Sequence, residues 1–162
     1  MPGLPPQLVL RPTRSTDTSA IRTLVRNAHL DPTQLHWRQF WVIADEAEVI
    51  ACGQLRHFPG VRKLGSLVVK PEWRRGGLAT ALVEHLLAST DAPVYLECRA
   101  GHMPFYERFG FKRVSWHQLP WPLKLKFGPM VLLSHLSWTQ RSIMIYRGQT
   151  RVARDQHDSS TS

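Results

Sequence analysis

The middle of the chain alternates a strand pattern, a helix pattern and a second strand pattern, and this order restricts the fold more than any other feature. Residues 64–70 (LGSLVVK) and 93–98 (PVYLEC) are short apolar runs, and residues 78–88 place apolar side chains at helical spacing. Such a succession implies that the two strands run parallel, because antiparallel neighbours need only a short turn. The pattern therefore predicts a sheet that contains a parallel strand pair with a crossover helix.

The segments on either side predict antiparallel strands and two further helices. Strand patterns occur at residues 7–13, 40–46, 48–58, 111–116 and 143–148. Asp17 is placed to cap a helix whose apolar residues keep helical spacing, and residues 102–111 predict a helix of one or two turns that ends at Gly110. The whole pattern predicts a mixed, mostly antiparallel α/β sheet of six to seven strands flanked by helices.

One domain accounts for most of the chain. A length of 162 residues suffices for one hydrophobic core, which we expect to span residues 1–147. Residues 117–140 contain three prolines that interrupt regular structure, and residues 130–138 suit a short amphipathic helix. Residues 148–162 lack apolar periodicity and are expected to be disordered.

Charge, cysteine and histidine content narrow the compartment and the ligands. The 21 Lys and Arg residues against 12 Asp and Glu give a net charge of +9, which favours anionic ligands. Cys52 and Cys98 form no CxxC motif, and neither a secretory leader nor a membrane-spanning run is recognisable, so a cytoplasmic protein is expected. None of the eight histidines forms an HxH, HExxH or Cys/His motif, so no metal is expected.

The junction between strand and helix at residues 73–80 has the features of an anion site. A helix N-terminus leaves its first backbone N–H groups unpaired and has a partial positive charge. Gly76 and Gly77 expose these amides, and Arg74 and Arg75 add positive charge at the rim. The junction suits a diphosphate, although a plain turn with solvated arginines has the same local sequence. The absence of GxxxxGK[ST] and GxGxxG motifs argues against a P-loop and a dinucleotide-binding fold.

Residues 68–82 (VVKPEWRRGGLATAL) resemble the central motif of the GNAT superfamily of acyl-CoA-dependent N-acyltransferases. The family pattern, R/Q-x-x-G-x-G/A after a V-x-P strand end, is matched by Arg74, Gly77 and Ala79. Residues 105–114 (FYERFGFKRV) are similar to the family's second motif, Y-x-x-x-G-F. Both motifs stand in the family's order, and the predicted elements follow the family's topology over residues 7–147. By this resemblance residues 117–140 are expected to be an insert that is atypical of the family.

The resemblance implies that acetyl-CoA binds as a cosubstrate where two parallel strands splay apart. The main chain of Leu67, Val68 and Val69 would contact the pantetheine arm and polarise the thioester carbonyl, as a tetrahedral intermediate requires. The turn would hold the diphosphate. It contributes Arg74, Arg75, Gly76, Gly77, Leu78, Ala79 and Thr80.

The resemblance also implies a catalytic pair. Tyr106 would act as the general acid, and Glu97 would act as the base, directly or through water. Each has a structural alternative, since Tyr106 would otherwise pack between a helix and the sheet, and Glu97 would pair with a basic neighbour such as Arg99. Relatives with a similar LE-x-R-A strand usually have an Asn between the two that contacts CoA, and this chain has none, so either His102 replaces it or the contact is absent.

We therefore expect an enzyme that moves an acetyl group from acetyl-CoA to a primary amine by direct attack in a ternary complex. The acceptor would be a small molecule, a protein N-terminus or a lysine, and the protein a monomer or a homodimer. Trp37, Phe40 and Trp41 are placed where family members hold the acceptor, whereas Trp73 either stacks on adenine or packs in the core. Two alternatives stay open: a non-catalytic acyl-CoA-binding regulatory domain, and a basic nucleic-acid-binding module, which no reader motif supports.

Overall fold

The computed structural model describes residues 4–125, 128 and 141–148. Its strands are β1 (Leu8–Pro12), β2 (Phe40–Asp45), β3 (Glu48–Phe58), β4 (Val61–Val69), β5 (Val94–Arg99), β6 (Lys112–Arg113) and β7 (Arg141–Tyr146). Its helices are α1 (Thr18–Asn27), α2 (Leu78–Ala88) and α3 (Met103–Glu107). Short 3-10 turns are η1 (Ser15–Asp17), η2 (Trp37–Gln39), η3 (Pro71–Trp73), η4 (Ala100–His102) and η5 (Trp116–Gln118).

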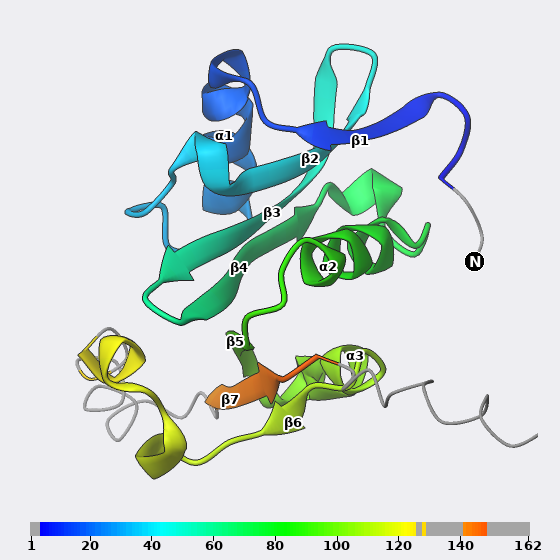
Figure 1. The fold of residues 1–162 in the computed structure, drawn as a ribbon. Helices are drawn as coiled ribbons and strands as arrows, with labels where there is room; N and C mark the ends of the chain where they lie inside the picture. The colour runs from blue at the N-terminus through cyan, green and yellow to red at the C-terminus, as the bar shows by residue number, and fades with distance from the viewer. Residues whose placement is uncertain (1–3, 126–127, 129–140, 149–162) are drawn as a thin grey trace, which may run out of the picture.

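The strands form one mixed sheet in the order β1-β2-β3-β4-β5-β7-β6 (Figure 1). Every neighbouring pair is antiparallel except β4 and β5, which run parallel and are joined through α2. The predicted fold class is therefore confirmed, including the single parallel pair and the crossover helix. None of the helices in the described ranges is long and apolar enough to cross a membrane.

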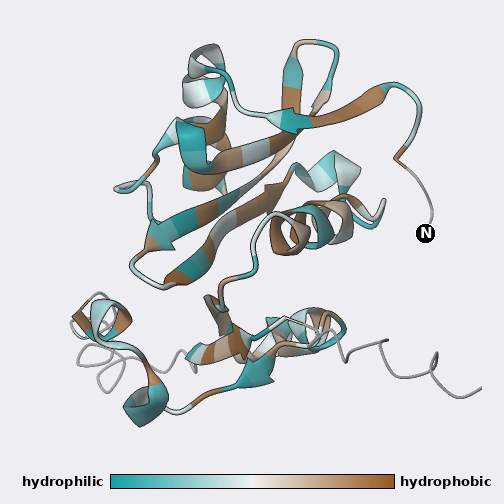
Figure 2. Cartoon of the chain, in the orientation of Figure 1, coloured by the Kyte–Doolittle hydropathy of each residue, from teal (hydrophilic) through white to brown (hydrophobic). Residues whose placement is uncertain are grey.

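Helices α1 and α2 cover opposite faces of the sheet. Neighbouring residues of β2 point to opposite faces, so Val42 packs in a cluster with Val25 of α1, while Ile43 packs with Leu82 of α2. Helix α3 lies on the same face as α2, because its Tyr106 packs against the cluster that contains buried residues of α2. Figure 2 shows hydrophobic residues along the central strands and on the helices that pack against them. Burial of these two faces holds the strand and helix ends of the site in place.

A bulge bends β4 near the middle of the sheet. The register between β3 and β4 shifts between Cys52 and Gln54, so that Ser66 and Leu67 together lie opposite Gly53. Ser66 has a φ of 49°, in the left-handed region that non-glycine residues rarely adopt. A bulge strengthens the local twist and turns a strand away from its former neighbour.

The parallel strands β4 and β5 pair only over a short stretch and then separate. Their ladder ends at the pair Leu64 and Leu96, whereas β5 continues to pair with β7 as far as Arg99. In Figure 1 the sheet accordingly divides into one part with β1 to β4 and another with β5, β7 and β6. Beyond Leu64 none of the described strands pairs with the edge of β4 that faces β5, which leaves main-chain groups there available to a ligand.

The region after α3 differs from the prediction in one place. The strand expected at residues 111–116 is a strand only over Lys112–Arg113, because Ser115 caps the 3-10 turn η5 that begins at Trp116. A helical segment follows at residues 121–125, and its Leu123 is fully buried beside Tyr95. The helix expected at residues 130–138 and the tail from residue 149 onward lie outside the described residues.

Asp17 is directed back toward β1 and does not cap α1 with its side chain. Its carboxylate accepts two hydrogen bonds from the Arg11 guanidinium, at 2.7 and 3.0 Å, and one from the Arg14 backbone N–H at 2.7 Å. The capping prediction is therefore wrong about the partner, since α1 receives no side-chain cap from this residue. The hydrogen bonds from Arg11 hold the pKa of Asp17 below its usual value of 3.8.

Replacing Asp17 with Asn tests this anchor. The substitution keeps the shape but removes the charge, and we expect the free energy of unfolding to fall by about 1–3 kcal/mol at pH 7. Because the pKa is depressed in the folded state, the difference from the wild type is present above pH 3.8 and disappears as pH falls below that value. Urea unfolding at several pH values measures it. Asp91→Asn, at an exposed loop position, is the control, and a difference that did not depend on pH would contradict the ion-pair explanation.

Candidate functional site

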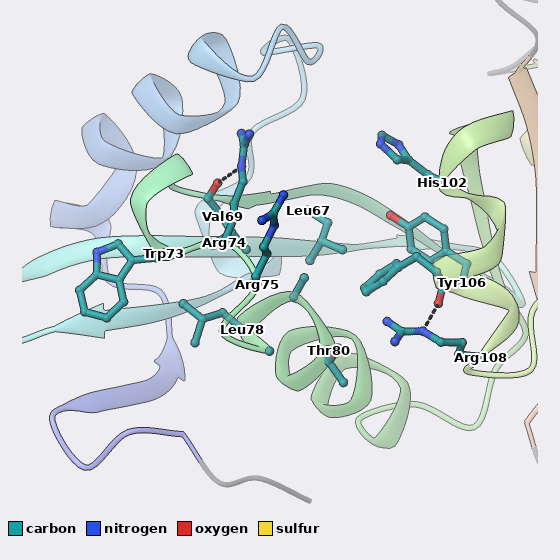
Figure 3. Close-up of a pocket in the computed structure, with 13 residues that line it drawn as sticks. Leu67, Val69, Trp73, Arg74, Arg75, Leu78, Thr80, His102, Tyr106 and Arg108 are labelled. Atoms are coloured by element: carbon teal, nitrogen blue, oxygen red, sulfur yellow. Dashed lines mark hydrogen bonds between the residues drawn. The ribbon is translucent and has the colours of Figure 1, made fainter.

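A cavity of about 510 Å³ lies between the start of α2 and the helix α3, against the bulged end of β4 (Figure 3). It is lined by Leu67, Val69, Trp73, Arg74, Arg75, Gly77, Leu78, Ala79, Thr80, His102, Phe105, Tyr106 and Arg108. Two segments that are distant in the sequence therefore form its walls. One is the junction between β4 and α2, and the other is α3 with the residues on either side of it.

The turn before α2 presents backbone amides to this cavity. The first helical hydrogen bond runs from the Ala81 N–H to the Gly77 carbonyl at 3.0 Å, so the amides of the three preceding residues lie ahead of the helical ladder. Gly77 has a φ of 77°, which explains why glycine stands there. Arg75 has a φ of 68°, an uncommon conformation for an arginine that is often associated with functional turns. The amides, together with the helix dipole, make this turn a favourable place for an anion.

The side chains around the cavity strengthen this preference. Its lining includes the three arginines Arg74, Arg75 and Arg108, together with His102, and none of its described lining residues is acidic. Arg74 also donates a hydrogen bond from Nε to the Val69 carbonyl at 3.3 Å, which ties the turn to the end of β4. Arginines fit phosphate oxygens because the guanidinium offers several N–H donors in one plane.

Tyr106 projects from α3 toward the β4 side of the cavity (Figure 3). Its ring packs edge-to-face against Phe105 and Phe111, with centroid separations of 5.0 and 5.9 Å. Within the described ranges no protein group accepts a hydrogen bond from its hydroxyl. Burial raises the pKa of Tyr106 to about 12, so the hydroxyl stays protonated at neutral pH and can act as a donor.

A second cavity, of about 580 Å³, opens beside the same strand gap. It includes residues of β4 and β5 on both sides of the separation, and Glu97 and Arg141 line it as well. Both cavities contain Leu67, Val69, Arg74, His102 and Tyr106, so they meet at the point where β4 and β5 diverge. A ligand in one cavity could therefore reach a second molecule in the other.

Glu97 lies in the second cavity and is engaged in an ion pair. Its Oε1 accepts a hydrogen bond from Arg141 at 2.9 Å, and its side chain is only 9% exposed. The sequence suggested Arg99 as the competing partner, but the structure pairs Glu97 with Arg141 from the neighbouring strand. Glu97 and Tyr106 both line this cavity.

The structure brings most of the sequence-predicted site residues together. Those that line the first cavity are Leu67, Val69, Arg74, Arg75, Gly77, Leu78, Ala79, Thr80 and Tyr106, together with Trp73, which also packs against the core. Val68 has a buried side chain and Gly76 does not line this cavity, so these two would contribute only through their main chain. Sequence reasoning missed Phe105 and Arg108, which the second motif contains but which no pattern marked as facing a ligand.

The expectation that Phe40 and Trp41 line an acceptor site is wrong. Phe40 is 1% exposed in the core, and Trp41 packs against His85 with ring centroids 3.9 Å apart. The alternating pattern of β2 directs these two side chains to the two packed faces of the sheet. Trp37 stacks with Arg38 at 4.7 Å from its ring centroid and lines neither cavity at the strand gap.

The raised pKa of Tyr106 can be measured by tyrosinate absorbance. In a pH titration of the wild type and of Tyr106→Phe, we expect both proteins to show the same tyrosinate signal at about pH 10.5, with the signal of Tyr106 appearing only near pH 12. A smaller signal in the variant at pH 10.5 would mean that the phenol is solvated and not held in an apolar wall. Tyr146→Phe is the control for loss of one tyrosine.

Comparison with known proteins agrees with this geometry. Residues 36–113 match the family model described as the acetyltransferase (GNAT) domain. A curated mouse protein, cysteine-rich protein 2-binding protein, is 39% identical over 49 residues, which is 28% of this chain and 6% of that protein. The chain thus corresponds to a small part of this relative.

Several solved structures share the fold. N-acetylglutamate synthase from Neisseria gonorrhoeae, complexed with coenzyme A and L-arginine, has a TM-score of 0.71 and 17% identity over 86% of this chain and 33% of its own. Rv2747 from Mycobacterium tuberculosis, in complex with CoA and NLQ, has a TM-score of 0.66 and 19% identity over 85% of this chain and 97% of its own. The ribosomal-protein-S18-alanine N-acetyltransferase from Escherichia coli has a TM-score of 0.62 and 19% identity over 85% of this chain and 92% of its own. The domain match over residues 36–113, the two motifs and the sheet topology therefore agree in identifying a GNAT acetyltransferase domain in this chain.

Proposed function

We propose that this protein transfers an acetyl group from acetyl-CoA to a primary amine by direct attack within a ternary complex. The observation that supports the proposal most strongly is the meeting of two cavities at the gap between β4 and β5, with Tyr106 lining both. One cavity has the amides and arginines suited to a diphosphate, and the other has space for an acceptor. Similar structures solved in complex with coenzyme A add support, because that molecule is bound by proteins with this fold.

In this proposal the turn at residues 75–80 binds the diphosphate of CoA. The pantetheine arm would then extend along β4, where the main chain of Leu67 to Val69 lies beyond the end of the ladder with β5. Main-chain N–H groups at this edge would stabilise the oxyanion of the tetrahedral intermediate, and the rigid sheet would keep them in position without further reorganisation.

Tyr106 and Glu97 would handle the protons. Glu97, directly or through a water molecule, would take a proton from the attacking amine as the new C–N bond forms. Tyr106 would donate a hydrogen bond to the sulfur as the C–S bond breaks and negative charge develops there. A phenol whose pKa is about 12 is a weak acid. Its main role would therefore be to stabilise the developing thiolate through this hydrogen bond, and transfer of its proton to the sulfur would follow.

The extent of the catalytic domain and the location of the protein in the cell are also proposals. We propose that residues 1–147 act as one catalytic domain and that the protein works in the cytoplasm, where its two buried cysteines, Cys52 and Cys98, would stay reduced. Among the described residues, no group of three or more His, Cys, Asp or Glu side chains could hold a metal ion. The proposed reaction needs no metal.

The diphosphate site can be tested at Gly77. In both Gly77→Glu and Gly77→Gln the new residue must adopt the same unfavourable positive φ, and its Cβ meets no atom within 4 Å. The two variants therefore differ mainly in charge. We expect Gly77→Glu to weaken CoA binding by at least about 100-fold and Gly77→Gln to weaken it much less, because only the carboxylate repels the diphosphate. Titration calorimetry measures the affinity, and melting curves confirm folding. Equal losses in the two variants would contradict an electrostatic role for the turn.

The role of Tyr106 in turnover has a separate test. We expect Tyr106→Phe to lower kcat by about 100-fold or more while the affinity for acetyl-CoA is retained, because the ring still packs and only the hydroxyl is lost. Release of free CoA thiol with an amine acceptor measures the rate. Phe105→Leu is a matched control, since Phe105 lines the same cavity but has no donor. Full activity of the Tyr106→Phe variant would return Tyr106 to a purely structural role.

A further inference from the structure

The second cavity has an unusual charge distribution for a site that must receive an amine. Its described lining includes the basic residues His29, Arg74, Arg99, His102 and Arg141, and Glu97 is the one carboxylate among the described lining residues. An amine is protonated at neutral pH in water, so a simple cation would be repelled here. The described lining therefore favours something other than an ordinary cationic acceptor.

Two of these arginines lie opposite each other on neighbouring strands of the sheet. Arg99 ends β5 and Arg141 begins β7, and they are Cα partners in the antiparallel register between these strands. Side chains in such positions have Cβ atoms about 4.5–5.5 Å apart, and like charges placed there destabilise the sheet. Negative charge between or beside the two guanidinium groups offsets this repulsion.

Glu97 supplies negative charge at this place. It lies two residues before Arg99, hence on the same face of β5, and it forms an ion pair with Arg141 at 2.9 Å. Among the described lining residues Glu97 is the one carboxylate beside Arg99 and Arg141, and Arg99 is an exposed residue at the cavity wall. The described lining therefore has more basic than acidic side chains next to the strand gap.

We infer that the acceptor amine bears a carboxylate close to the amino group, and that Arg99 and Arg141 bind this carboxylate. The inference rests on the proposed acetyl transfer and specifies its substrate class. Two kinds of acceptor share this recognition chemistry, a free amino acid and a peptide with an acidic residue next to its N-terminus. Guanidinium pairs suit a carboxylate because each can donate two parallel N–H bonds.

The same charges would also assist the reaction. An ammonium group held near guanidinium groups loses its proton more readily, because nearby positive charge disfavours the charged form. The carboxylate would bring the acceptor into the cavity, and the remaining positive field would keep its amino group neutral for attack on the thioester. A lysine side chain or a polyamine has no carboxylate beside its reacting amine and would be disfavoured.

Matched acceptor pairs test the inference. The first pair is L-aspartate and L-asparaginamide, in which both carboxylates become amides, and the second is a short peptide amide with Asp or Asn in the second position. We expect the carboxylate member to show a kcat/KM about tenfold or more above its amide partner in at least one pair, measured by free-thiol release. The pair that shows the preference identifies the source.

Variants of Arg99 separate recognition from catalysis. Arg99→Met should raise KM for the carboxylate acceptor about tenfold or more, with KM for acetyl-CoA and for the amide acceptor unchanged. Arg113→Met is the matched control, because Arg113 is also an exposed strand residue and lines none of the described cavities. Binding of the same amines to the CoA-loaded protein, followed by calorimetry, gives a second readout that does not depend on turnover.

The outcomes distinguish this inference from the proposed function. If no amine causes thiol release, acetyl transfer fails, and the binding readout alone decides whether a carboxylate is recognised through Arg99. If the amides are acetylated as well as their carboxylate partners and bind equally well, the inference is wrong while the proposed function stands. A tenfold binding preference that is lost in Arg99→Met and kept in Arg113→Met supports it.

Discussion

The divergence of β4 from β5 after the pair Leu64 and Leu96 is the feature on which the rest of the site depends. A continuous ladder would satisfy the main-chain groups of β4 within the sheet and would leave no edge for a ligand. The bulge at Ser66 and Leu67 bends β4 at this point, and α2 and the partners of β5 fill the space on either side. The separation of β4 from β5 thus needs a well-packed core around it. The two cavities are a direct consequence of this separation.

The second requirement is positive charge, and the chain supplies it in two distinct ways. At the turn before α2 the charge comes from unpaired amides and the flanking arginines Arg74 and Arg75, all close in sequence. At the other cavity it comes from Arg99 and Arg141, which only the sheet register brings together. The net charge of +9 is therefore not only a general property of the surface, because part of it is concentrated where the proposed substrates would lie.

The sequence predicted the elements well where local periodicity decides them. The strands and helices follow from alternation and from helical spacing, and the turn at residues 74–80 was recognisable because its glycines and arginines are contiguous. What could not be predicted depends on tertiary neighbours. The ion pair of Glu97 joins residues 44 positions apart, and the ligand-facing position of Arg108 depends on how α3 packs. The sequence predicts the helix boundary at Asp17 correctly, but the hydrogen bonds of Asp17 with Arg11 depend on the geometry of β1.

The most direct test of the account is a crystal structure of this protein with bound CoA. We expect the diphosphate oxygens to accept hydrogen bonds, at about 2.7–3.2 Å, from backbone amides within residues 75–80, and the sulfur to lie at the gap between β4 and β5 near the Tyr106 hydroxyl. CoA bound at another place, with the N-terminus of α2 left empty, would contradict the account.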